Sequence, residues 1–124
     1  MAAFTFDHIH LRSPDPEATA AFYERVFGAT LKHGPQRIDI NLGGQLLFVS
    51  PITEDKTGDA PSAPYRGLEH IGLAVKDIDA VVAEMKAKGV TFTMDPTTIR
   101  PGVRIAFLRG PENISIELLE RSAA

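Results

Sequence analysis

The sequence predicts an α+β protein made of two βαβββ modules in tandem, which form curved mixed sheets. Three observations support this fold class. Residues 6–15 alternate between apolar and polar side chains, and residues 68–77 repeat that pattern, with an acid–histidine pair near the start and an aspartate at the end. Each copy is followed by apolar residues at helical spacing. Three short strand-like segments then follow each predicted helix.

The first module opens with a predicted strand at residues 4–12, which places Phe6, His8, His10 and Arg12 on one face. Asp15 is a typical N-cap, Pro16 suits the first helical position, and Gly28 ends the helix. We expect three further strands, at residues 30–32, 36–42 and 45–50, with Gly43-Gly44 as a hairpin turn.

The second module repeats this order. We predict a strand at residues 69–75 and then a helix that Asp77 caps and Gly89 ends. Three strands should follow, at residues 90–94, 103–108 and 114–119. The predicted organisation is therefore one domain over 1–124, with modules at 1–50 and 68–124 and a linker at 51–67. The linker is long enough for the modules to pair within one chain, for them to swap between chains, or for it to cover a site.

Composition excludes several classes of protein. The 124 residues include no cysteine, which rules out disulfides, a thiolate nucleophile and a cysteine zinc site. The net charge is −3, and no run of Lys and Arg marks a nucleic-acid surface. Apolar stretches are far shorter than the roughly 20 residues of a membrane span. The N-terminus has no signal-peptide pattern, so we expect a cytoplasmic protein without a nucleic-acid or membrane partner.

Two histidines and one carboxylate form the strongest candidate site. His8 and His70 stand at equivalent places in the two copies of the repeat. Glu117 lies in an apolar run, where a carboxylate is costly to bury unless it is paired or bound to a metal. Two histidines and one carboxylate with open coordination positions suit Fe(II) and other divalent transition metals. A histidine alone in a strand is more often structural. The equivalent positions of His8 and His70 in the repeat favour a role as metal ligands.

Other polar residues are candidates for contact with a small-molecule substrate. His10 and Arg12 share the face of His8 and belong to the first module only, because Gly72 and Ala74 stand at their places in the second. We also assign substrate contacts to three further residues, which are Arg37, Arg104 and Tyr65. For Arg12 the alternative is an exposed polar strand face, and Arg37 lines either a pocket or the solvent-facing surface.

Four segments resemble the vicinal oxygen chelate superfamily, which contains the glyoxalases, bleomycin resistance proteins and extradiol dioxygenases. They are Asp7-His8-Ile9-His10-Leu11, residues 22–28, Glu69-His70-Ile71-Gly72-Leu73 with the residues up to Asp77, and residues 113–118. The resemblance covers nearly the whole chain apart from the linker. It implies paired βαβββ modules, a homodimer, and a divalent metal (Fe, Mn, Ni, Co or Zn) held by His8, His70 and Glu117.

The resemblance also shows one departure from the family pattern. In glyoxalase I and methylmalonyl-CoA epimerase, a fourth metal ligand comes from the last strand of the first module. Here the matching position falls at Leu47 or Phe48, and neither can ligate a metal. A three-ligand pattern remains, which resembles the dioxygenases and the fosfomycin resistance enzymes and leaves room for a substrate to chelate through two oxygens.

From these features we expect a glyoxalase-like lyase or isomerase that acts on a small oxygenated substrate, with the metal stabilising an enolate. His10 is the candidate general base or hydrogen-bond partner of the substrate, and Glu117 belongs to the catalytic set as a metal ligand. One alternative is an extradiol-type ring-cleaving dioxygenase with a 2-His-1-Glu site. Another is a metal-free dimer that binds a drug or other ligand, against which the two histidines and the glutamate argue.

Overall fold

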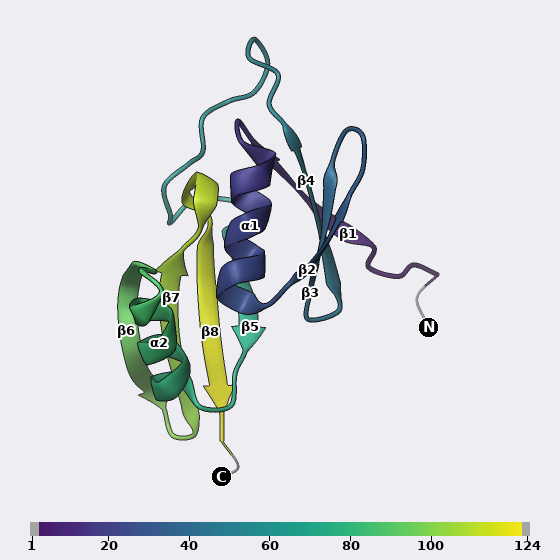
Figure 1. Cartoon of the computed structure of the whole chain (residues 1–124). Coiled ribbons are helices and arrows are strands. Elements are labelled where there is room, and N and C mark those ends of the chain that lie inside the picture. Colours follow the sequence, from purple (N-terminus) through teal and green to yellow (C-terminus); the bar gives the residue numbers. More distant parts are fainter. Residues whose placement is uncertain (1–2, 123–124) are drawn as a thin grey trace. The chain divides into compact units, whose positions relative to one another are not determined.

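The structure is a computed structural model that describes residues 3–122. The expectation that the N-terminus has no signal peptide concerns Met1 and Ala2 as well, and these two lie outside the described residues. It divides into two compact units, Met1–Asp59 and Ala60–Ala124. Each unit contains one βαβββ module with a four-stranded mixed sheet (Figure 1). The predicted α+β fold class with two such modules is confirmed.

Unit 1 holds the elements β1 (His8–Ser13), α1 (Pro16–Phe27), β2 (Thr30–His33), β3 (Ile38–Leu42) and β4 (Gln45–Pro51). Its strands lie in the order β1-β4-β3-β2. Strand β1 runs parallel to β4, whereas β4, β3 and β2 are antiparallel neighbours. The last strand of the module therefore lies between the first strand and the hairpin strands.

Local sequence explains the limits of α1. The carboxylate of Asp15 accepts a hydrogen bond from the backbone N–H of Ala18 at 3.1 Å, as an N-cap does. Gly28 ends the helix in the left-handed region, with φ of 71°. The helix packs on β3 and β4, and Tyr23 and Ile40 are fully buried between them. One face of the sheet is thus covered by the helix.

Unit 2 holds β5 (His70–Ala74), α2 (Ile78–Ala87), β6 (Phe92–Arg100), β7 (Val103–Arg109), the short 3-10 helix η1 (Pro111–Asn113) and β8 (Ser115–Arg121). The strand order β5-β8-β7-β6 repeats that of unit 1, and β5 is parallel to β8. Asp77 caps α2 through the N–H of Ala80. Ile78, Val82 and Met85 form its buried stripe.

Two strands differ from the sequence-based expectation by more than two residues at one end. Strand β1 begins at His8 instead of Phe4, so the exposed Phe4 and Phe6 precede it. Strand β6 continues past Pro96 to Arg100, although we expected it to end near residue 94. A proline is tolerated there because β6 is an edge strand, and the register shifts along its pairing with β7 absorb the irregularity.

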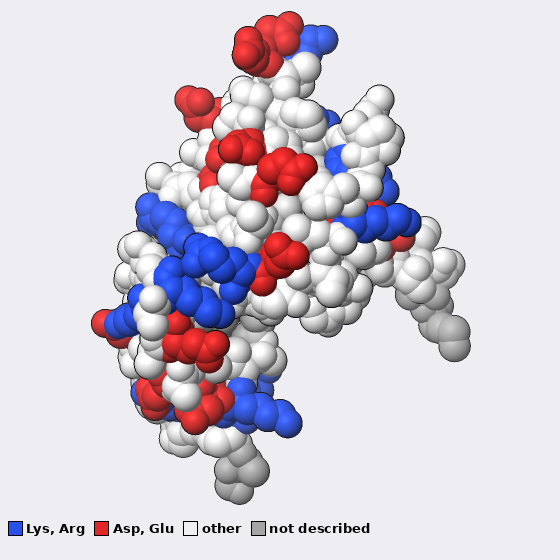
Figure 2. Space-filling model, in the orientation of Figure 1, with Lys and Arg blue, Asp and Glu red and all other residues white. Residues whose placement is uncertain are grey.

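The surface carries charged side chains of both signs. Lys and Arg side chains lie next to Asp and Glu side chains over the face drawn in Figure 2. Within residues 3–122, neither helix is long and apolar enough to cross a membrane.

Candidate functional site

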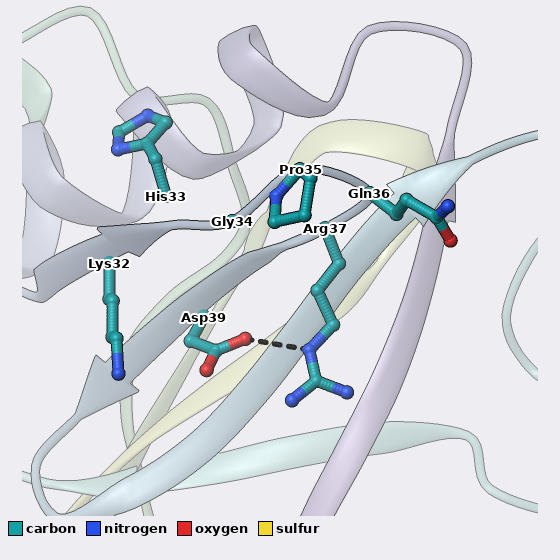
Figure 3. A pocket seen from close by; sticks show the side chains of 7 residues that line it. All are labelled: Lys32, His33, Gly34, Pro35, Gln36, Arg37 and Asp39. Carbon is teal, nitrogen blue, oxygen red and sulfur yellow. Dashed lines mark hydrogen bonds and ion pairs between the residues drawn. The ribbon is translucent and has the colours of Figure 1, made fainter.

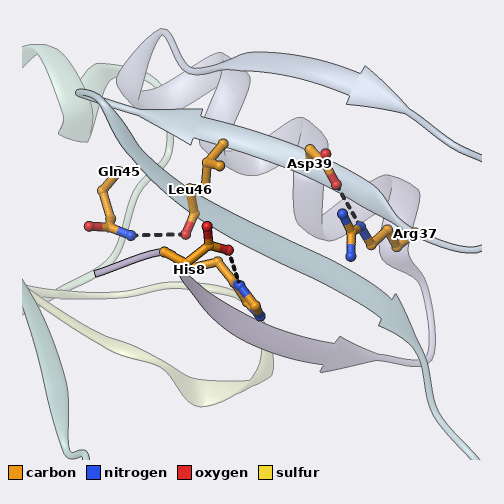
Figure 4. A network of polar contacts seen from close by, with 6 residues as sticks. His8, Arg37, Asp39, Gln45 and Leu46 are labelled. Atoms are coloured by element: carbon orange, nitrogen blue, oxygen red, sulfur yellow. Dashed lines mark hydrogen bonds and ion pairs between the residues drawn. The ribbon is translucent and has the colours of Figure 1, made fainter. Parts of the chain in front are cut away.

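Each unit begins its first strand with a histidine held by the acid that precedes it. His8 Nδ1–H donates to Asp7 Oδ2 at 2.7 Å in unit 1, a contact drawn in Figure 4. His70 Nδ1–H donates to Glu69 Oε1, also at 2.7 Å, in unit 2. An ionised carboxylate only accepts hydrogen bonds, so it keeps a proton on Nδ1, and Nε2 is the nitrogen that remains to bind a metal. This is the arrangement that proteins commonly use to orient a metal-binding histidine.

In unit 2 a second acid approaches the free nitrogen of this histidine. The parallel pairing of β5 with β8 sets Gly72 opposite Glu117, and Glu117 Oε1 lies 3.4 Å from His70 Nε2. Gly72 leaves room for this carboxylate, because a Cβ at that position would lie 3.6 Å from Glu117 Oε1. The neighbours Ile116 and Leu118 are buried on the other face of the strand. Glu117 is therefore not inside the apolar core, and its side chain keeps 20% of its exposure.

Unit 1 carries a phenylalanine where unit 2 carries Glu117. The register that sets Gly72 opposite Glu117 sets His10 opposite Phe48. The sequence analysis matched the fourth-ligand position to either Leu47 or Phe48. By register, Phe48 is the residue that corresponds to Glu117, whereas Leu47 lies in the core and is 1% exposed. The Phe48 ring stacks on the imidazole of His8, with ring centroids 4.1 Å apart and an interplanar angle of 27°.

Three of the predicted substrate-contact residues line one pocket of unit 1. Its volume is about 500 Å³, and its lining includes His10, Arg12, Arg37 and Ser50. His10 Nε2 lies 2.6 Å from Ser50 Oγ, and Arg12 Nη1 donates to the carbonyl of Pro51 at 3.0 Å. None of the described lining residues is acidic, so the two guanidinium groups make the pocket attractive to an anion.

The environment of His10 favours its neutral form. Partial burial lowers its pKa below the usual 6.5, and the charges of Arg12, His8 and Arg37 lower it further. A neutral imidazole can accept a proton, which is a requirement for the predicted general base.

A second pocket of about 370 Å³ adjoins the loop between β2 and β3. Lys32, Arg37 and Asp39 project to one side of the hairpin, and Arg37 Nε donates to Asp39 Oδ1 at 2.9 Å (Figure 3). His33 also lines this pocket but points to the opposite side, where it contacts Glu17 of α1 at 3.0 Å. Arg37 therefore borders both pockets.

Two predicted contact residues lie in unit 2. Arg104 faces α2, where its Nη1 donates to Asp79 Oδ2 at 2.6 Å, and this hydrogen bond raises its pKa. Strand register puts Arg104 opposite Glu120, on the face that does not carry Glu117. The structure therefore does not bring Arg104 to His70 and Glu117. Tyr65 lies near them, since its hydroxyl donates to the carbonyl of Glu69 at 3.1 Å.

The donor atoms suit a divalent transition metal, although no ready-made cluster of three is present. Within residues 3–122, no three His, Cys, Asp or Glu side chains gather closely enough to hold a metal ion. His70 and Glu117 come together in unit 2, whereas His8 belongs to unit 1. Imidazole nitrogens with fixed Nδ1 protons and a carboxylate oxygen are suitable ligands for Fe, Mn, Ni, Co or Zn.

Sequence reasoning did not assign a role to Asp7, Glu69, Ser50 or the ring of Phe48. Adjacent strand residues point to opposite faces, so an acid next to a histidine is not expected to contact it. Asp7 and Glu69 reach their neighbours because both strands begin only at the histidine. The repeated acid–histidine pair was the signal that could have revealed these contacts.

The comparisons with known proteins agree with this architecture. The family model described as "Glyoxalase/Bleomycin resistance protein/Dioxygenase superfamily" matches residues 5–118. The uncharacterized protein YaeR of Escherichia coli is 32% identical, over 92% of this chain and 94% of the relative. A crystal structure of the glyoxalase family protein from Enterococcus faecalis has a TM-score of 0.76 at 25% identity, and covers 97% of this chain and 100% of that chain.

Two relatives with named activities are longer than this chain. A lactoylglutathione lyase of Arabidopsis thaliana is 27% identical over 94% of this chain, and the human mitochondrial methylmalonyl-CoA epimerase is 29% identical over 68% of it. The matched segments cover 44% and 53% of those relatives, so this chain spans about half of their length.

Proposed function

The chain belongs to the Glyoxalase/Bleomycin resistance protein/Dioxygenase superfamily, and on that basis we propose that it is a divalent-metal enzyme acting on a small oxygenated substrate. The observation that carries this proposal is the pair of equivalent histidines. Both donate Nδ1–H to a preceding carboxylate at 2.7 Å, and Nε2 of His70 faces Glu117. A histidine that served packing alone would not need this orientation twice at matching positions.

We assign His8, His70 and Glu117 as the ligands of the metal. When bound, the metal would polarise a substrate oxygen and stabilise negative charge as it develops. Asp7 and Glu69 keep each imidazole in the tautomer whose Nε2 is free. The apolar Phe48 leaves unit 1 with one ligand, so coordination positions stay open for substrate oxygens.

The pocket beside His10 supports a substrate that carries negative charge. Arg12 and Arg37 present guanidinium groups there, and a planar guanidinium matches the two oxygens of a carboxylate. Ser50 contributes a hydroxyl that also contacts His10. We propose that these groups orient a small anionic substrate whose reacting carbon lies near His10. Tyr65, in the segment before β5, is a further proposed substrate contact.

His10 is the proposed general base. Its Nε2 lies beside Ser50 Oγ, so the imidazole is held at the edge of the pocket and does not pack in the core. Removal of a proton next to a carbonyl group, followed by its return, would give lyase or isomerase chemistry. The names of two relatives, a lactoylglutathione lyase and a methylmalonyl-CoA epimerase, support this reaction class.

A ring-cleaving dioxygenase is the second candidate, favoured by the ligand count. Phe48 at the fourth position leaves two histidines and one glutamate, and such a three-residue set suits Fe(II) oxygenases.

Elemental analysis of the purified, untagged protein tests the metal assignment first. We expect about one metal ion per chain, its loss after chelation, and its absence in His70→Ala. His33→Ala is the matched control, because His33 is exposed and contacts Glu17 on the helix side of its sheet. The proposal is wrong if the wild type takes up none of Fe, Mn, Ni, Co or Zn even after reconstitution, which would favour a metal-free ligand-binding dimer.

The loaded enzyme then separates the reactions. Turnover of S-lactoylglutathione or methylmalonyl-CoA, or exchange of the proton next to their carbonyl group in D₂O, would support the lyase or isomerase. Oxygen uptake with catechol by the iron-loaded protein would support the dioxygenase. Light scattering of the same sample measures the oligomer, which we propose is a homodimer.

A further inference from the structure

The ring of Phe48 lies between two planar groups on the open face of the unit 1 sheet. On the β1 side, the imidazole of His8 stacks on it with centroids 4.1 Å apart. On the β3 side, the guanidinium carbon of Arg37 lies 3.6 Å from the ring centroid. Strand β4, which carries Phe48, runs between β1 and β3. Although Phe48 faces away from α1, it is only 6% exposed.

The outer end of this stack is itself fixed. Arg37 Nε donates to Asp39 Oδ1 at 2.9 Å, and Asp39 is the register partner of Phe48 on the neighbouring strand. The guanidinium is therefore held at its Nε edge and cannot leave the ring freely. A cation over an aromatic face adds an attraction of its own. The order of contacts across the sheet is Asp39, Arg37, Phe48 and His8.

This stack supplies a constraint that the hydrogen bond to Asp7 does not. A single hydrogen bond at Nδ1 fixes one atom of the imidazole and still permits the ring to turn about that contact. A flat contact with Phe48 fixes the plane of the ring. Together the two contacts determine the direction in which Nε2 points.

Unit 2 orients its histidine differently. His70 has the corresponding hydrogen bond to Glu69, but Phe107 meets its ring edge-on, with centroids 5.2 Å apart and an interplanar angle of 84°. Register places Phe107 opposite Glu117, just as it places Asp39 opposite Phe48. The phenylalanine and the acid have thus exchanged strands between the units, and among residues 3–122 the flat stack on a histidine of the two pairs occurs in unit 1.

We propose that Phe48 is a positioning residue for His8, and that Arg37, through Phe48, holds the imidazole plane in the orientation a metal ion needs. The inference rests on the proposed function where it concerns the metal. The orientation of the ring itself does not depend on any bound metal. Arg37 then has two contacts of consequence, since it borders the substrate pocket and also supports the stack.

The test compares Phe48→Leu, which removes the aromatic face, with Phe48→Tyr, which keeps it. Phe22→Leu is the matched control, because it makes the same change in an aromatic cluster of α1 with Tyr23 and Phe27. Circular dichroism verifies that all three fold. The first readout is the NMR shift of the His8 ring protons in metal-free protein, assigned with His8→Ala. The second is Ni²⁺ affinity, measured by calorimetry.

We expect Phe48→Leu to move the His8 ring protons away from their stacked shift and to weaken Ni²⁺ binding about tenfold, the scale seen when partners that orient a metal ligand are removed. Phe48→Tyr and Phe22→Leu should keep both values close to wild type. The inference is overturned if Phe48→Leu leaves the His8 shifts unchanged, or if the shifts move while wild-type Ni²⁺ affinity is retained. If wild type binds no Ni²⁺, the metal assignment fails, and the nuclear Overhauser contact between the His8 and His10 rings decides the orientation of His8 by itself. Its loss in Phe48→Leu and retention in Phe48→Tyr would support the role of Phe48, and its retention in both variants would overturn that role.

Discussion

The two units share a scaffold but differ on the open face of their sheets. Both begin with an acid–histidine pair, cap a helix with aspartate, and place the last strand parallel to the first. Unit 1 then carries His10 and Arg12 on its first strand, whereas unit 2 has Gly72 and Ala74 at those positions. The face that does not touch the helix has few packing demands, so its residues can diverge between two copies of one module.

The two units differ in the chemical groups that they offer to a ligand. Unit 2 brings His70 and Glu117 to within 3.4 Å of each other, which makes it the half richer in candidate metal ligands. Unit 1 has the pocket lined by Arg12 and Arg37, which makes it the half suited to hold a substrate.

The largest expected effect concerns the ligands of unit 2. Glu117→Ala removes the carboxylate next to His70 and should weaken Ni²⁺ binding by at least about 100-fold, because loss of a ligand exceeds the 10–100-fold cost of losing its supporting partner. Calorimetry measures this affinity. Glu112→Ala, a change in an exposed acid of η1, should have no effect. Equal Ni²⁺ affinities for wild type and Glu117→Ala would show that Glu117 is not a metal ligand, and unit 2 would then not be richer in metal ligands than unit 1.

A large effect on rate alone is expected in unit 1. His10→Ala should lower turnover about 10²–10⁴-fold, the usual contribution of a general base, while the metal content stays at the wild-type level. Single-turnover kinetics, with whichever of the probe compounds named under Proposed function the wild type converts, measures the rate, and elemental analysis measures the metal. Metal loss in this variant would mean that His10 helps to hold the metal, and would contradict its assignment as a general base alone.

A smaller effect concerns the start of each helix. Pro16 begins α1 without an N–H, while the N–H of Ile78 at the start of α2 donates to Glu120 Oε1 at 2.8 Å. Glu120→Ala leaves that donor without its partner and should lower the free energy of unfolding by about 1–2 kcal/mol. Urea denaturation measures it. Glu24→Ala, an acid change on the surface of α1, should alter stability by less than about 0.5 kcal/mol, and an equal loss in both variants would contradict this role of Glu120.

The smallest effect concerns the two helix cores. Tyr23 of α1 is fully buried, Met85 holds the matching place in α2, and the Tyr23 hydroxyl has no hydrogen-bond partner among residues 3–122. Burial raises the pKa of this hydroxyl, so it stays protonated. Tyr23→Phe removes an unsatisfied polar group and should raise the free energy of unfolding by up to about 1 kcal/mol. A loss of stability in urea denaturation would show that the hydroxyl has a partner.

The sequence was sufficient for the elements that depend on near neighbours. Asp15 and Asp77 marked the helix starts, and Gly43-Gly44 marked the hairpin turn, where both residues have positive φ. These features are local, because a cap or a tight turn is determined by a few consecutive residues. The internal repeat extended that local information to the whole fold and matched His8 with His70.

Contacts across the sheets needed the tertiary structure. Strand register decided that Phe48 lies against His8 and Glu117 against His70, although 40 residues separate the first pair and 47 the second. The sequence did not indicate that Glu120 accepts the N–H of Ile78 at the start of α2. It also left Arg104 free to reach the site, and Asp79 holds it on the helix side. A one-residue change in register turns every side chain of a strand to the other face, so the identity of the site's neighbours is fixed by the packed sheet and not by the chain's local pattern.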